Sequence, residues 1–256
     1  MCLVPHPSSA MQAWEQLTAI RRECRDPGFF RWPPHANLLY PFLEPPVAST
    51  DEGEDDDADR RRFREELAIH LKRAAERCEP FDVTIESFGT FGGKRRGVLW
   101  ADPKSRREKR ARKEEEDEEE DAPLIRLHRA LQETFPACQD HTARAPFRPH
   151  MTVSHYEDVD RARTALEGIQ SRWTPVSFHV PEIYVLERQG DGGQFKISAT
   201  VPLGTGSGKP VQFHDPPVPF PAMPAEEEAW VYEERMAMKE RRKNAFGKRR
   251  ETKAKD

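Results

Sequence analysis

Two short segments far apart in the chain, residues 34–38 and 149–153, have the residue types needed for proton transfer. Each holds a histidine after a proline, and a polar side chain two residues later: His35 and Asn37 in the first, His150 and Thr152 in the second. In an extended strand, side chains two residues apart point to the same face. Each segment therefore presents one imidazole and one hydrogen-bond donor together.

Two imidazoles and two donors are what cleavage of a phosphodiester without a metal ion requires. One neutral imidazole accepts a proton from the attacking water or hydroxyl, and the other, protonated, donates one to the departing oxygen. An unperturbed histidine pKa of about 6.5 leaves both protonation states populated near neutral pH. The Asn37 amide and the Thr152 hydroxyl can donate to the nonbridging oxygens. Arg31 and Arg148, which precede the histidines, are further candidates for contact with substrate.

The elements that position these segments follow one order twice: a helix, an extended segment, a helix and two strands. Apolar periodicity and turn residues place them at 9–24, 29–42, 63–78, 81–85 and 97–101 in the first half, and at 124–135, 147–156, 159–169, 176–186 and 195–201 in the second. This duplication predicts an α+β fold of two lobes related by an approximate two-fold axis. Antiparallel sheets would line a central cleft, with the helices outside.

Composition divides the chain into one domain and a tail. Of the 256 residues, 34% are charged, and these gather in a few runs. We expect a domain over 1–202 with flexible charged insertions near 48–58 and 104–121. Residues 203–256 form a proline-rich linker and a charged, extended or helical tail that could contact RNA or a protein.

Net charge, cysteine spacing and hydropathy indicate the kind of partner and the cellular compartment to expect. The formal net charge of −4 indicates no overall attraction to nucleic acid, so such contacts would be local. The four scattered cysteines form no C-x-x-C pair, which favours a reducing compartment over a disulfide framework or a zinc knuckle. The sequence shows no pattern of a secretory leader or a membrane span, so we expect the protein in the cytoplasm or nucleus. We also expect a monomer.

The paired motifs resemble the 2H phosphoesterase superfamily, whose mark is a His-x-Ser/Thr-hydrophobic motif in each lobe of a bilobal α+β fold. The resemblance covers roughly residues 1–202. It implies that His35 and His150 are catalytic, with no cofactor, and that the substrates are RNA ends or cyclic nucleotides with 2′,3′-cyclic phosphates or 2′-5′ linkages. Asn37 departs from the usual hydroxyl residue; because an amide still donates to phosphate, we expect altered specificity or rate.

Other interpretations of these residues stay open. His35, His150 and His155 could bind a metal, but no Asp, Glu or Cys at ligand spacing accompanies them. His155 and His128, which lack a paired motif, are interpreted as surface or helix residues. Three aromatic residues near the 81–101 hairpin could stack on a base, although core packing explains them better: Phe88, Phe91 and Trp100.

Two classes of function therefore compete. The first is a phosphodiesterase, with 2′-5′ RNA ligase or RNA 3′-end exonuclease activity as variants within the enzyme class. The second is a catalytically weak RNA-binding or scaffold protein that keeps the fold, which Asn37 and the charged segments motivate.

Overall fold

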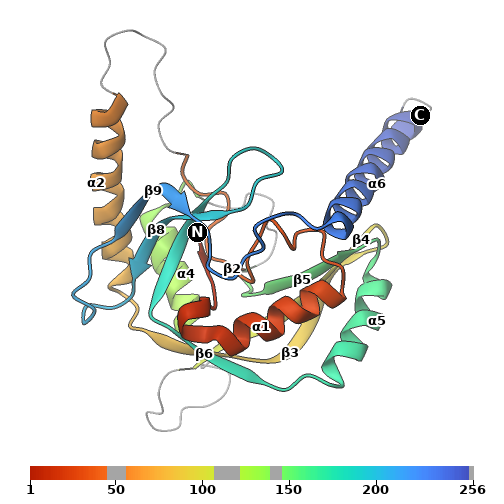
Figure 1. Cartoon of the computed structure of the whole chain (residues 1–256), viewed down its shortest axis with the longest axis horizontal. Coiled ribbons are helices and arrows are strands. Elements are labelled where there is room, and N and C mark those ends of the chain that lie inside the picture. The colour runs from red at the N-terminus through yellow and green to blue at the C-terminus, as the bar shows by residue number, and fades with distance from the viewer. Residues whose placement is uncertain (45–55, 107–121, 139–145, 254–256) are drawn as a thin grey trace.

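A computed structural model describes residues 1–44, 56–106, 122–138 and 146–253 (Figure 1). Within these residues the helices are α1 (Pro7–Glu23), α2 (Asp56–Ala75), α4 (Pro123–Thr134), α5 (Val159–Gln170) and α6 (Ala229–Lys253). The strands are β1 (Cys2–Leu3), β2 (Ala36–Asn37), β3 (Phe81–Gly93), β4 (Arg96–Arg106), β5 (Met151–Tyr156), β6 (Val176–Val180), β7 (Glu182–Glu187), β8 (Lys196–Pro202) and β9 (Gln212–Val218). The predicted mixture of helices and antiparallel strands is confirmed.

All strands join in one antiparallel sheet with the order β6-β3-β4-β5-β2-β1-β7-β8-β9. The strands of the two histidine motifs, β2 and β5, are neighbours near its middle. The two sides of the sheet do not correspond to the two halves of the chain, because β3 and β4 pair with β5 and β6 from the second half. Long-range pairing, rather than chain order, thus brings the motifs together.

The helices form where the apolar periodicity predicts them. In α1, Trp14, Leu17 and Ile20 are buried at helical spacing. This helix begins at Pro7, where the His6 ring accepts a hydrogen bond from the Ser8 backbone N–H. The predicted start at residue 9 is therefore two residues late, because proline suits the first helical position and a side chain ahead of it supplies the cap.

Two of the extended segments are shorter than the sequence predicts. Between residues 29 and 42 only Ala36–Asn37 is a strand, because the backbone N–H groups of Arg31 and Trp32 donate to the Gly28 carbonyl and form turns. Between residues 147 and 156 the strand begins only at Met151. Each histidine therefore lies immediately before its strand, as the last residue of the preceding turn or loop.

The segment predicted as one strand from 176 to 186 is two strands that join opposite sides of the sheet. β6 pairs with β3 at one edge, whereas β7 pairs with β1 and β8 beyond the centre. The break falls at Pro181, which has no N–H to donate to a strand partner. The chain thus crosses between the two sides of the sheet at this residue.

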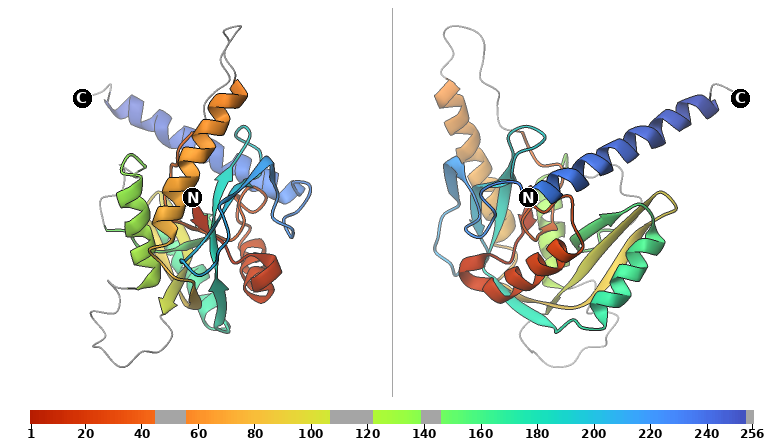
Figure 2. Two further views of the ribbon diagram at one scale, coloured as in Figure 1. Left: turned by 90° about the vertical axis from the view of Figure 1, so that its left-hand side faces the viewer. Right: turned by 45° about the vertical axis from the view of Figure 1, so that its right-hand side comes forward.

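The tail and the charged insertions depart from their predicted bounds. Residues 45–55 and 107–121 lie outside the described residues, while residues 56–58 begin α2 and residues 104–106 complete β4. Beyond residue 202, β9 pairs with β8, and Phe220 and Val231 are buried. The folded unit thus continues past residue 202, and α6 then projects from its body (Figure 2).

Candidate active site

The register between β2 and β5 brings the two motifs to one place. Ala36 lies opposite Met151, and both side chains are buried. Extending this antiparallel register by one residue in each direction places His35 opposite Thr152 and Asn37 opposite His150. Because side chains alternate between faces, these four lie on one face, opposite to the face of the buried pair. The structure thus brings together the two imidazoles, the amide and the hydroxyl that the sequence singles out.

Both imidazoles are held in the same way by the backbone. The Nδ1 of His35 lies 2.8 Å from the Pro33 carbonyl oxygen, and the Nδ1 of His150 lies 2.9 Å from the Arg148 carbonyl oxygen. Because a carbonyl oxygen can only accept, Nδ1 must carry the proton in both rings. In the neutral form, each Nε2 therefore keeps its lone pair for an incoming proton.

The His35 ring stacks on an aromatic neighbour that the sequence reasoning missed. The Trp32 indole lies nearly parallel to the imidazole, with ring centroids 4.5 Å apart and an interplanar angle of 13°. Trp32 also stacks on Phe195, at 3.5 Å. The position of Trp32, three residues before His35, could have indicated a contact between the two rings. Phe195 is too distant in the sequence for its part in the stack to be predicted. This packing restricts the orientation of the imidazole.

The His150 ring meets two aromatic residues of the β3–β4 hairpin edge-on. The Phe91 and Trp100 rings lie 5.1 and 6.3 Å from it, at angles of 88° and 73°. Trp100 is buried across from Gly89, where a Cβ would come within 2.2 Å of the indole, so only glycine leaves room for this ring. Phe88 is also buried but packs on Trp173. Trp100 and Phe91 therefore form one wall of the site.

Burial lowers the pKa of both histidines. For His35, burial is the largest cause and brings the pKa to about 4; the hydrogen bond to Pro33 opposes it, while the charges of Arg21 and His150 add to it. For His150, burial again lowers the pKa, the Arg148 carbonyl opposes it, and the charge of Arg148 lowers it further. Both rings are thus neutral at physiological pH, and an anionic phosphate between them would favour protonation of one.

The two arginine candidates differ in placement. Arg148 is exposed, and its guanidinium carbon lies 4.6 Å from the centroid of the Trp100 ring, beside His150. Arg31 is half-buried and donates to the Asp191 carbonyl oxygen at 3.5 Å. The contacts described for Arg31 lie with the loop before β8, so the structure brings Arg148, rather than Arg31, to the histidine pair.

The two histidines without a paired motif, His128 and His155, have partners of their own. His128 is on α4, and its ring stacks on Phe147 at 3.6 Å. His155 is on β5 with its Nδ1 3.8 Å from Asp26, half-buried rather than on the surface. Within the described ranges, no cluster of three or more histidine, cysteine or acidic side chains could hold a metal ion.

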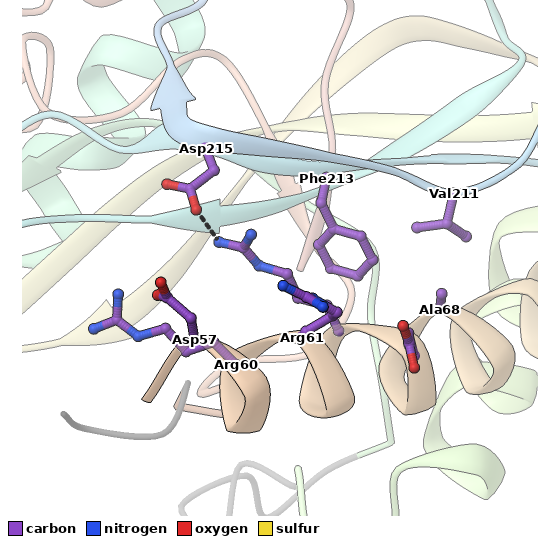
Figure 3. Close-up of a pocket in the computed structure, with 9 residues that line it drawn as sticks. Asp57, Arg60, Arg61, Ala68, Val211, Phe213 and Asp215 are labelled. Carbon is purple, nitrogen blue, oxygen red and sulfur yellow. Dashed lines mark hydrogen bonds and ion pairs between the residues drawn. The ribbon is translucent and has the colours of Figure 1, made fainter. Parts of the chain in front are cut away.

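A hollow of about 360 Å³ lies elsewhere, between α2 and β9 (Figure 3). Arg60, Arg61 and Arg64 line it together with Phe213, and Arg64 forms an ion pair with Asp215 at 2.8 Å. Equal numbers of arginines and acidic residues surround it, so it has no excess charge, and neither histidine of the pair belongs to it. This hollow is therefore not assigned to the chemistry of the site.

A histidine pair presented by neighbouring antiparallel strands of a mixed α/β fold is the arrangement that defines the 2H phosphoesterase class. The model of the 2'-5' RNA ligase superfamily, which belongs to that class, matches residues 7–192, so the chain is a member of this family. No curated protein matched the chain. No described helix is long and apolar enough to span a membrane. Membership supports the processing of phosphodiesters in general.

Proposed function

We propose that this protein is a metal-independent phosphodiesterase that opens 2′,3′-cyclic phosphates or cleaves 2′-5′ linkages at RNA ends. The observation that carries the proposal is the pairing of Ala36 with Met151, which sets both histidine motifs on one face of adjacent strands. The matching Nδ1 hydrogen bonds support it, because they direct the chemistry of both rings to Nε2. Family membership supports the reaction class.

In this mechanism His35 is the general base and His150 the general acid. His35 is assigned as the base because its pKa of about 4 keeps the ring neutral, and hence able to accept a proton, at any pH above that value. A water oxygen bonds to phosphorus as His35 takes a proton from it. The bond from phosphorus to one ribose oxygen breaks, and His150, protonated when the anionic substrate binds, gives that oxygen its proton.

Three further side chains suit the charge on the phosphoryl group. The Asn37 amide and the Thr152 hydroxyl, on the same face as the imidazoles, donate to the nonbridging oxygens, where donors act most strongly in the transition state. Arg148, exposed beside His150, adds a positive charge.

The order of the strands supports the proposal of two lobes about a pseudo-two-fold axis. Three strands lie on one side of the β2–β5 pair, β4, β3 and β6, and β1, β7 and β8 lie on the other.

The reaction is tested with a panel of phosphoesters in excess EDTA. We expect turnover of a 2′,3′-cyclic nucleotide or of a 2′-5′-linked dinucleotide, unaffected by the chelator, because the two imidazoles supply both proton transfers. Product analysis by chromatography separates hydrolysis from removal of RNA 3′ nucleotides, and adding a 5′-hydroxyl RNA tests ligation. RNA binding without turnover of any panel member would instead favour the scaffold alternative, in which the projecting α6 contacts RNA (Figure 2).

The pH dependence of kcat/KM follows from the two lowered pKa values. The base works only when His35 is deprotonated, above about pH 4, and the acid works only when His150 is protonated, below its lowered pKa and hence below the ordinary 6.5. We therefore expect a bell-shaped profile with its maximum on the acid side of neutrality. Initial rates at low substrate concentration measure it, with circular dichroism at each pH to verify folding. A maximum above neutral pH would contradict the assignment.

A further inference from the structure

A buried ion pair behind the His35 segment takes no part in the proton transfers above. The Nε and Nη2 of Arg21, at the end of α1, donate to Oδ2 of Asp26 at 3.0 and 2.7 Å. The two side chains are only 4% and 3% exposed. Removing both charges from water is costly, so such a pair needs further hydrogen bonds to persist. Its additional partners indicate what it holds in place.

Arg21 supports the turn that leads to His35. Its Nη1 donates to the Trp32 carbonyl oxygen at 2.8 Å, and its Nη2 donates to the Gly28 carbonyl oxygen at 3.2 Å. The guanidinium therefore fixes both ends of the turn from 28 to 32. The indole of Trp32 then stacks on the His35 ring. A shift of this turn would move the surface against which the imidazole rests.

Asp26 connects the same turn to the other motif. Its Oδ1 accepts a hydrogen bond from the Gly28 N–H at 3.0 Å and lies 3.8 Å from Nδ1 of His155 on β5. The neighbouring Ser154 hydroxyl, also on β5, donates to the Cys24 carbonyl oxygen at 3.1 Å. The end of α1 is thus attached to the strand that follows His150 as well as to the turn that precedes His35.

We propose that Arg21 and Asp26 are positioning residues that set the spacing between the two imidazoles. They touch neither substrate nor the reacting atoms; they act through Trp32 on His35 and through β5 on His150. The kinetic part of this inference rests on the proposed function. Because a displacement of about 1 Å can cost about 10²-fold in rate, loss of the pair should lower kcat far more than it changes KM.

Two variants separate positioning from folding. Arg21→Lys keeps the charge, but a single ammonium cannot reproduce the planar fork that reaches Asp26 and Trp32 together. The double variant Arg21→Met with Asp26→Leu replaces the pair by apolar side chains, a change that often leaves stability unaltered or improved. We expect both variants to lose about 10²-fold in kcat with KM nearly unchanged, even where the thermal unfolding midpoint matches the wild type.

A second readout does not depend on turnover. In ¹⁵N spectra of the imidazoles, the wild-type protein should show His35 as the Nδ1–H tautomer, and both variants should show a mixture. Arg22→Met is the matched control: this neighbouring residue is exposed, pairs with Glu228, and should change neither rate nor spectrum.

Each outcome decides the inference. Wild-type kcat and wild-type His35 signals in a folded double variant would overturn it. If the double variant does not fold, Arg21→Lys decides by the same two measurements. If the wild-type protein turns over no phosphoester, the proposed function fails, and the spectra alone still show whether the pair orients His35.

Discussion

His35→Ala and His150→Ala are each expected to lower kcat for 2′,3′-cyclic phosphate opening by about 10²–10⁴-fold, the usual contribution of a positioned acid or base. Both rings orient Nε2 through the same kind of backbone hydrogen bond, so each should be required. The double variant should lose little more than the worse single variant, because the two groups act in one step. Steady-state kinetics on purified proteins measure these losses.

A control for this experiment is His179→Ala. His179 is exposed on the edge strand β6, and its ring bonds to Asp82 on the neighbouring strand, so it offers the same substitution away from the pair. We expect wild-type kinetics from it. Wild-type kcat in either His35→Ala or His150→Ala would remove the basis of the mechanism, whatever the fold.

Thr152→Val and Asn37→Leu are expected to lower kcat by about 10²–10³-fold each, the effect of losing one donor to a developing oxyanion. Valine keeps the shape and branching of threonine, and leucine approximates asparagine, so each change removes mainly the hydrogen bond. The loss should fall on kcat more than on KM, because these donors act most strongly when negative charge accumulates in the transition state.

The conservative changes Thr152→Ser and Asn37→Ser test the same point from the other side. Both keep a donor, so we expect activity to stay within about tenfold of the wild type. Thr84→Val is the matched control, since its hydroxyl pairs with Ser177 on β6, apart from the histidine motifs. If Thr152→Val or Asn37→Leu were as active as this control, that residue would have no role at the phosphate.

The local elements could be predicted from sequence because their signals are local. The helix from Pro7 buries Trp14 and Leu17 at helical spacing, and α2, α4 and α5 fall where apolar residues recur in the same way. The two histidine segments were recognisable for the same reason, since a strand of any register presents residues two apart on one face.

The predictions that failed depend on contacts between distant residues. The break between β6 and β7 has a local cause, because Pro181 has no N–H for a strand partner, but which side of the sheet each strand joins is decided by pairing with distant strands. Similarly, the extended segment from 29 to 42 contains turns that the buried Arg21 stabilises from another element. The spacing of apolar residues within a segment does not reveal contacts with other elements.

From residue types and spacing alone, four side chains could be singled out as candidates for contact with a phosphate: two imidazoles, an amide and a hydroxyl, each pair on one face of its own segment. That the two segments are neighbours, with Ala36 opposite Met151, follows only from how the chain folds. Folding also buries His35, which holds its pKa near 4, and brings Arg21 to support the preceding turn. Side-chain type and alternation are properties of a local stretch, whereas strand register, desolvation and the contacts of a buried ion pair arise only when distant residues pack together.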